Sequence, residues 1–136
     1  MRNRTKAREC ALKILYAADI TKDAPGDCSD MFWQTHEGVT KEVRDFTVFL
    51  TEGVEKNGKY IDSVITKYAK NWQLKRMATI DRNILRISTF ELLFAEEVPP
   101  KVSINEAIEM AKKYGDKDSG KFVNGVLDKI NKTEQK

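Results

Sequence analysis

The chain has 136 residues, 40% of them hydrophobic, which is enough for one domain with a real core, spanning residues 1–136. It has no run of about eighteen apolar residues and no apolar signal-peptide centre, so we expect a soluble cytoplasmic protein. Cys10 and Cys28 form no CxxC pair, which favours reduced thiols. The only histidine, His36, lacks metal-ligand spacing to either cysteine. No serine sits in a G-x-S-x-G turn, so we expect neither an enzyme nor a cofactor.

Positive charge gathers at the start of the chain, although the net charge is only +3. Residues 1–13 hold a single acid, Glu9, and five bases: Arg2, Arg4, Lys6, Arg8 and Lys13. Cations at a helix N-terminus oppose the helix dipole, so helix stability does not explain them. An anionic partner, most commonly a nucleic acid, explains them better. A solvated terminus without a function is the alternative, and charge alone does not separate the two.

The first half of the chain has helical periodicity. A helix over residues 4–20 would bury Ala7, Cys10, Ala11, Ile14, Leu15 and Ala18, and would leave Tyr16 off the buried stripe. After a break at residues 24–27, a shorter helix is expected over residues 30–36. Residues 40–68 favour one long, bent helix in which Gly58 permits close packing, while two helices divided at Asn57-Gly58 remain open.

The second half repeats the helical pattern. A connection is expected at residues 71–73, and a helix over residues 79–95 would bury Ile80, Ile84, Ile87 and Phe94. Glu91 falls on that buried face without a second acid or histidine nearby, so we interpret it as a structural carboxylate rather than a catalytic acid. No segment alternates with period two. The sequence therefore predicts an all-α fold of six or seven helices.

Residues 98–130 contain the clearest local signals. Pro99 and Pro100 end the preceding helix, and Ser103 with Glu106 matches a capping box that would begin the next one. That helix should end near Tyr114, before Gly115 as a C′ residue. A turn then leads to a last helix with Asp118 or Ser119 at its N-cap, buried through Phe122, Val123, Val126, Leu127 and Ile130.

This turn also matches the start of a phosphate-binding P-loop, G-x-x-x-x-G-K, through Gly115, Gly120 and Lys121. We reject that interpretation because Phe122 stands where a serine or threonine should bind magnesium, and because a helix precedes the motif where a strand is required. A recognition surface remains, in which the N-terminal bases contact phosphates and exposed aromatics stack on unpaired bases. The aromatic candidates are Tyr68, Trp72 and Phe122.

Three segments carry a family resemblance. RTKARECALKILYAADI at residues 4–20, DRNILRI at residues 81–87, and INEAIE with KFVNGVL at residues 104–127 resemble the NusB transcription antitermination factors. The resemblance implies a bacterial protein of two packed three-helix subdomains. It would bind single-stranded boxA leader RNA together with the ribosomal protein NusE and help to assemble an antitermination complex on RNA polymerase, promoting processive transcription of ribosomal RNA operons.

The resemblance also implies site residues. By position, the RNA-binding residues are Arg2, Arg4, Lys6, Arg8, Tyr68, Asp118, Lys121 and Phe122. Asp118 would weaken phosphate binding through its negative charge. Tyr16, Asp81 and Arg82 are similar to residues that face NusE.

Three alternatives stay open. The protein could be an interaction scaffold that binds no RNA. It could be the RNA-binding module of a ribosomal-RNA cytosine methyltransferase, although residues 1–136 leave no room for a cofactor-binding α/β domain. Because some relatives self-associate, the free protein could also be a homodimer.

Overall fold

The computed structural model describes residues 2–70 and 73–134, and Trp72 and Asn71 lie outside them. Within these residues the chain forms seven α-helices, one 3-10 turn and no strand, which confirms the all-α prediction. The helices are α1 (Asn3–Thr21), α2 (Pro25–Thr35), α3 (Lys41–Lys56), α4 (Gly58–Tyr68), α5 (Thr79–Phe94), α6 (Pro100–Tyr114) and α7 (Ser119–Thr133), with the 3-10 turn η1 at Leu74–Arg76.

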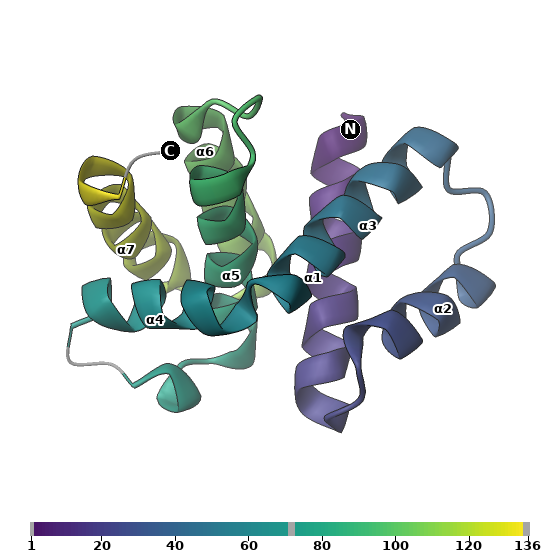
Figure 1. Ribbon diagram of the computed structural model, residues 1–136, viewed down its shortest axis with the longest axis horizontal. Coiled ribbons are helices and arrows are strands. Elements are labelled where there is room, and N and C mark those ends of the chain that lie inside the picture. The colour runs from purple at the N-terminus through teal and green to yellow at the C-terminus, as the bar shows by residue number, and fades with distance from the viewer. Residues whose placement is uncertain (1, 71–72, 135–136) are drawn as a thin grey trace.

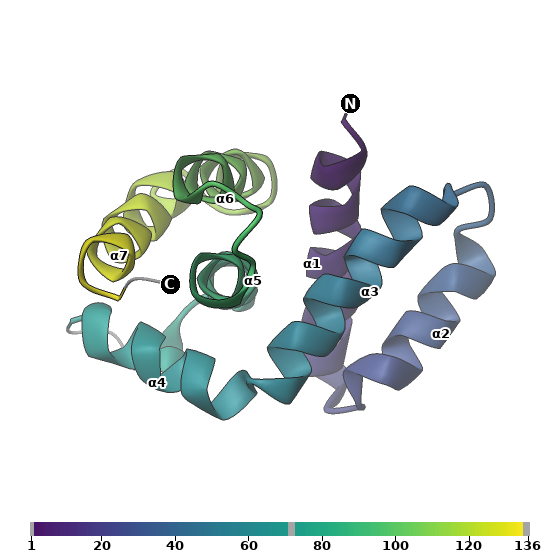
Figure 2. The same ribbon diagram turned by 45° about the horizontal axis from the view of Figure 1, so that its top comes forward.

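The helices form two groups joined through the central helix α5. On one side α1 packs against α2 and α3, and on the other α4, α6 and α7 pack against α5 (Figure 1). Figure 2 looks nearly along α5 and shows it enclosed by its neighbours. Because α1 and α3 also contact α5, a single apolar core runs through both groups.

Helix α5 is buried around most of its circumference rather than along one stripe. The expected residues Ile84 and Ile87 are fully buried, and so are several neighbours on other faces, including Leu85 and Thr89. Phe94, expected to be buried, is 41% exposed because it lies at the end of α5, where its ring contacts Phe90 and Tyr60. A helix this buried requires partners for its polar side chains.

Two expected helix boundaries in the first half are wrong. The second helix begins at Pro25 rather than near residue 30, because proline is favoured in the first turn of a helix, where its missing N–H costs nothing. Residues 40–68 form two helices, α3 and α4, rather than one. They divide at Asn57, whose side-chain amide donates to the carbonyl of Gly53.

Close packing between α3 and α5 occurs at Gly53 and not at Gly58. The Phe90 ring lies against Gly53 so tightly that a β-carbon there would clash with it, whereas Gly58 has open space around it. Gly53 therefore has the packing role expected of Gly58, and Gly58 is the first residue of α4.

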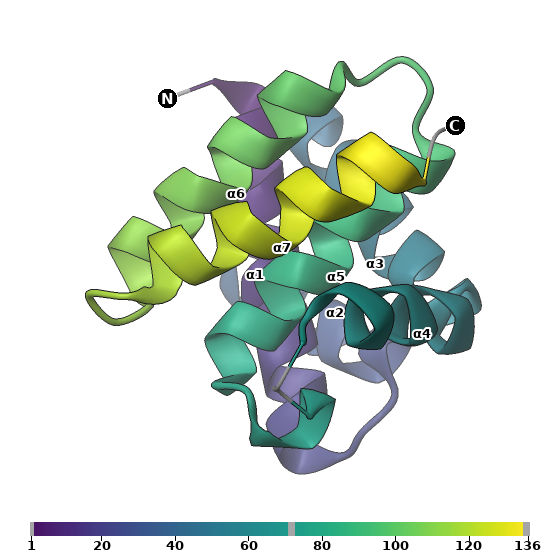
Figure 3. The ribbon, with the colours of Figure 1, turned by 90° about the vertical axis from the view of Figure 1, so that its left-hand side faces the viewer.

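The predicted capping box at Ser103 is also wrong. Helix α6 begins at Pro100, with Pro99 at the N-cap, so Ser103 lies inside the helix. The Ser103 hydroxyl is buried and shares a 2.8 Å hydrogen bond with Ser88, while Glu106 is bonded to α1 instead of the backbone of α6. Helix α6 ends at Tyr114 as expected, and Figure 3 shows α6 and α7 packed side by side in front of α5.

The turn between α6 and α7 joins two helices, in agreement with the rejection of a P-loop. Asp118 occupies the N-cap position of α7, and the Ser119 hydroxyl accepts from the backbone N–H of Asp116 at 3.0 Å. Cys10 and Cys28 are free thiols. Within residues 2–70 and 73–134, no helix is long and apolar enough to cross a membrane.

Candidate nucleic-acid interface

The N-terminal basic residues divide between two faces of α1. Arg2 and Lys6 are four residues apart and both are exposed. Lys13 is exposed too and lies on the same side, seven residues after Lys6. These three residues form a basic edge along α1, whereas Arg4 lies on the opposite side of the helix, over the same Phe46 ring as Arg8.

Arg8 does not belong to this edge, and the prediction that it presents its charge to phosphates is corrected. Its side chain is 3% exposed, and Nε and Nη2 donate to the two carboxylate oxygens of Glu91 at 2.8 and 2.9 Å. Nη1 donates to Glu106 at 3.3 Å. Arg8 therefore joins α1 to α5 and α6, and Glu91 is the satisfied structural carboxylate that the sequence predicted.

Arg4 is partly engaged within the protein. Its Nη2 lies 3.2 Å from Glu97, and its guanidinium carbon lies 4.4 Å from the centre of the Phe46 ring. The Arg4 side chain is nevertheless 46% exposed, so its charge is accessible at the N-terminal end of α1. Exposed ion pairs of this kind stabilise little, and Arg4 can exchange Glu97 for another anion.

A second basic region lies beside the α6–α7 turn. Lys121 is exposed and lines a groove of about 360 Å³ together with Lys112 and Lys117. Asp116 is the one acid among the residues that line it. The sequence prediction included Lys121 but missed Lys112 and Lys117, although their lysine-rich segment, KKYGDKDSGK, is visible in the sequence.

Helices α1 and α6 are tied together between these two basic regions. Lys113 Nζ lies 3.0 Å from Glu9 Oε1, and the Tyr114 hydroxyl donates to the same oxygen at 2.7 Å. The pKa of Tyr114 is raised, first by burial and then by the neighbouring Glu9 carboxylate. These contacts fix the C-terminal end of α6 beside the middle of α1, so the α1 edge and the lysine groove share one side of the molecule.

Tyr68 lies apart from Phe122. The Tyr68 hydroxyl donates to Glu134, just after α7, whereas Phe122 lies in the first turn of that helix. Twelve residues of helix separate positions 122 and 134, which is about 18 Å. Both rings are half-buried against the core, and the structure does not bring them together. Trp72, the third aromatic candidate, lies outside the described residues.

The three residues expected to face a protein partner differ in exposure. Tyr16 is 40% exposed on α1. Arg82 is held inside the protein, since its Nε donates to Asp19 at 2.9 Å and its Nη1 to the carbonyl of Leu74 at 3.0 Å. Asp81 is buried and lines a pocket between the start of α5 and the α6–α7 turn.

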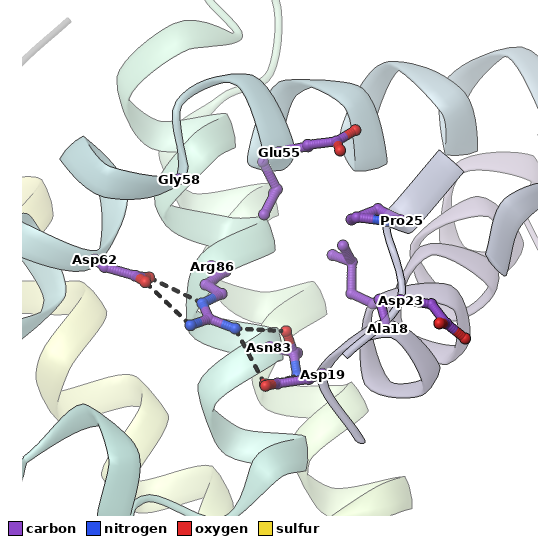
Figure 4. Close-up of a pocket in the computed structure, with 11 residues that line it drawn as sticks. Ala18, Asp19, Asp23, Pro25, Glu55, Gly58, Asp62, Asn83 and Arg86 are labelled. Carbon is purple, nitrogen blue, oxygen red and sulfur yellow. Dashed lines mark hydrogen bonds and ion pairs between the residues drawn. The ribbon is translucent and has the colours of Figure 1, made fainter. Parts of the chain in front are cut away.

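Arg82 belongs to a network that connects α1, α4 and α5. In this network Arg86 makes a paired contact with Asp62, at 2.8 and 3.0 Å, and also donates to Asp19 at 3.1 Å (Figure 4). Burial alone would raise the pKa of Asp19, but hydrogen bonds from Arg82 and Asn83 and the nearby arginine charges outweigh it and hold that pKa below its usual value. The network is a structural junction between the two groups of helices.

Comparison with known proteins identifies the family. A model described as the NusB family matches residues 5–132. Transcription antitermination protein NusB of Anaeromyxobacter dehalogenans strain 2CP-1 is 49% identical over 127 residues, covering 93% of this chain and 89% of the relative. That of Clostridium perfringens strain ATCC 13124 is 43% identical over 135 residues, covering 98% and 99%.

Solved structures agree with the sequence relatives. NusB of T. maritima superposes with a TM-score of 0.89 at 36% identity, covering 98% of this chain and 93% of that chain. A crystal structure of antitermination factors NusB and NusE in complex with dsRNA contains a chain with a TM-score of 0.89 at 31% identity, covering 97% and 98%. The conserved helical fold and the match over nearly the whole sequence lead to one conclusion: this chain belongs to the NusB family.

Proposed function

We propose that the protein is a transcription antitermination factor that binds boxA-type leader RNA together with the ribosomal protein NusE. The observation that carries the proposal is the basic edge of Arg2, Lys6 and Lys13, in a fold shared with a NusB that was crystallised with NusE and dsRNA. Phosphate contacts supply most of the non-specific affinity for nucleic acids, and exposed lysines and arginines on one side of a protein provide them.

The RNA path would run from the N-terminal end of α1 to the lysine groove beside the α6–α7 turn. Lys121 and Phe122 stay candidate contacts at that end, and Asp118, exposed beside them, is expected to weaken phosphate binding. Tyr68 would contact RNA only if the strand extends to the far end of α7. Arg8 is left out, because its guanidinium is occupied by two carboxylates.

The wider assembly follows from the same proposal. Residues 1–136 would act as one RNA-binding domain, and the complex with RNA and NusE would join the antitermination complex on RNA polymerase in ribosomal RNA operons. A homodimer of the free protein would compete with RNA if it covered the basic edge. Measuring the molecular mass in solution, with and without RNA, tests for that competition.

Binding of a labelled single-stranded boxA oligonucleotide tests the proposal. We expect NusE to strengthen binding, and the triple substitution Arg2→Ala, Lys6→Ala and Lys13→Ala to weaken it. The triple variant should also reduce the slope of log affinity against log salt by about 2, since each phosphate contact on a single strand contributes about 0.7.

A matched control removes three exposed cations elsewhere, Lys41→Ala, Lys56→Ala and Lys59→Ala on α3 and α4. The control should retain both affinity and salt slope. Equal losses in the two triple variants would contradict the proposed edge. NusE binding without any RNA binding would favour an interaction scaffold instead.

A further inference from the structure

The acid that follows the last helix contacts two hydrogen-bond donors at the end of α4. The Tyr68 hydroxyl donates to Glu134 Oε2 at 2.5 Å, and Lys67 Nζ lies 3.3 Å from the same oxygen. The Lys67 ammonium also lies 5.2 Å from the centre of the Tyr68 ring. The hydroxyl and the ammonium therefore converge on one point, which a single anionic oxygen occupies.

This pair of donors matches the chemistry of a phosphate. A phosphodiester oxygen accepts from tyrosine hydroxyls and lysine ammonium groups, as a carboxylate oxygen does. The Tyr68 ring packs against the core, so its hydroxyl is held in place before a ligand binds. Lys70, exposed three residues after Lys67, adds a second positive charge, and residues 63–70 contain no acid. With the Glu134 carboxylate removed, the end of α4 would bind an anion.

Glu134 can leave this position without unfolding α7. It is the C-cap residue of that helix, with an extended backbone (φ −98°, ψ 108°), and the buried side chain of Ile130 anchors the last turn to the core. The Lys67 side chain is 65% exposed, and exposed ion pairs of this kind contribute little to stability. A competing anion can therefore replace the carboxylate while the fold stays intact.

We infer that Glu134 is autoinhibitory: in the free protein its carboxylate occupies a phosphate subsite formed by Lys67 and Tyr68, and a bound RNA strand displaces it. The inference rests on the proposed RNA-binding function and adds a means of regulating it. Lys67, unlike Tyr68, is not among the residues that the family resemblance implies. The subsite gives the strand a phosphate contact at the end of α7 that lies away from the lysine groove.

The charges of the two side chains agree with this competition. Hydrogen bonds from Tyr68 and then from Lys67 lower the pKa of Glu134. Hydrogen bonds with Tyr68 and then with Glu134 raise the pKa of Lys67. The carboxylate and the ammonium are therefore both charged at neutral pH, so a phosphate competes with an anion for the same cation.

The subsite is tested first without RNA. The full chain, labelled for amide NMR, is titrated with inorganic phosphate at constant ionic strength, both as wild type and as Glu134→Ala. We expect saturable shifts at Lys67 and Tyr68, with an apparent affinity about two- to fivefold higher in Glu134→Ala, the range expected when an exposed ion pair no longer competes. Equal affinities, or no saturable shift at these two residues in Glu134→Ala, would overturn the inference.

The role in RNA binding is tested with the labelled boxA oligonucleotide. We expect Glu134→Ala to bind it about two- to fivefold more tightly than wild type. That gain should vanish in a chain that also carries Lys67→Ala and Tyr68→Phe, because the subsite is then absent. Asp30→Ala removes an exposed acid from α2 and is the matched control, which should leave the affinity unchanged.

Three results would overturn the autoinhibitory role: no gain in Glu134→Ala, an equal gain in Asp30→Ala, or an equal gain with the subsite removed. The last two would mean that Glu134 acts only through its negative charge. If the wild-type chain binds no RNA, the proposed function fails, and the phosphate titration still decides whether Glu134 covers an anion site.

Discussion

Helix α5 has a buried acid near each end, and the two acids differ in whether their oxygens have hydrogen-bond partners. Glu91, near the C-terminal end, is 0% exposed and has a paired contact with Arg8. Asp81, in the first turn, is nearly as buried, yet one of its oxygens has no partner. A buried carboxylate with both oxygens satisfied stabilises the fold, while one with an unsatisfied oxygen is expected to lower its stability.

Removing the partner of Glu91 should have the largest effect. Arg8→Ala leaves a buried carboxylate without its cation, which typically costs about 3–5 kcal/mol, and we expect the melting temperature to fall by roughly 10 °C or more. Thermal unfolding followed by circular dichroism measures this. Lys6→Ala, two residues away and exposed on the other side of α1, is the control and should change the melting temperature little.

Replacing both members of that ion pair should restore much of the lost stability. In Arg8→Met with Glu91→Leu, neither charge is buried, and apolar side chains of similar size fill the space. Glu106 keeps its hydrogen bond from Thr5. We expect the double variant to melt well above Arg8→Ala alone. A double variant as unstable as the single one would mean that the contact contributes through its geometry rather than through charge compensation.

Asp81→Asn should raise the melting temperature, whereas Arg8→Ala should lower it. Since the folded-state pKa of Asp81 is raised, the folded protein binds this proton more tightly than the unfolded chain does, and the ionised carboxylate lowers stability as pH rises through the raised pKa. We therefore expect Asp81→Asn to raise the melting temperature at pH 7. The difference should shrink below about pH 4, where the carboxyl is protonated in both states.

Melting curves of the wild-type chain and of Asp81→Asn at pH 7 and pH 3.5 show whether the substitution raises or lowers the melting temperature. A variant less stable than wild type at pH 7 would contradict the view that Asp81 is held at a cost for binding. If Asp81→Asn both stabilises the fold and weakens NusE binding, the two measurements together show a residue whose role is functional.

The sequence contained both members of the Arg8–Glu91 pair without linking them. Periodicity places Glu91 on a buried face as a structural carboxylate, while charge alone groups Arg8 with its basic neighbours. Arg8 lies four residues before Leu12, and both are buried on α1. The expected stripe lacks Leu12, and a stripe that includes Leu12 is wide enough to reach Arg8. A buried acid that needs a cation could then have been matched to a base on an apolar face.

The periodicity of the sequence predicts the number of helices and the all-α class. The predicted starts of two helices are wrong, because proline in the first turn determines where these helices begin. Prolines at 25 and 100 begin helices that the sequence pattern predicts three to five residues later: residues 24–27 resemble a break, and Ser103 with Glu106 resembles a capping box. The Asp81 pocket had no local signal at all. It forms only when the α6–α7 turn folds back on the start of α5, so residues more than thirty positions apart create it.

The α6–α7 turn has acids on one side and lysines on the other. Removing a single lysine there should have the smallest effect of the changes considered. While Asp81, Asp116 and Asp118 line one pocket, Lys112, Lys117 and Lys121 line the groove next to it. We expect Lys117→Ala to reduce the salt slope of RNA binding by about 0.7, the value for one phosphate contact on a single strand. NusE binding should not change, because the lysine lies outside the acidic pocket.

Lys129→Ala, exposed further along α7, is the control for loss of one positive charge. If both lysine variants lower the slope equally, the groove is not the path of the strand. If Lys117→Ala alone lowers it, the strand passes over the lysine groove beside the α6–α7 turn.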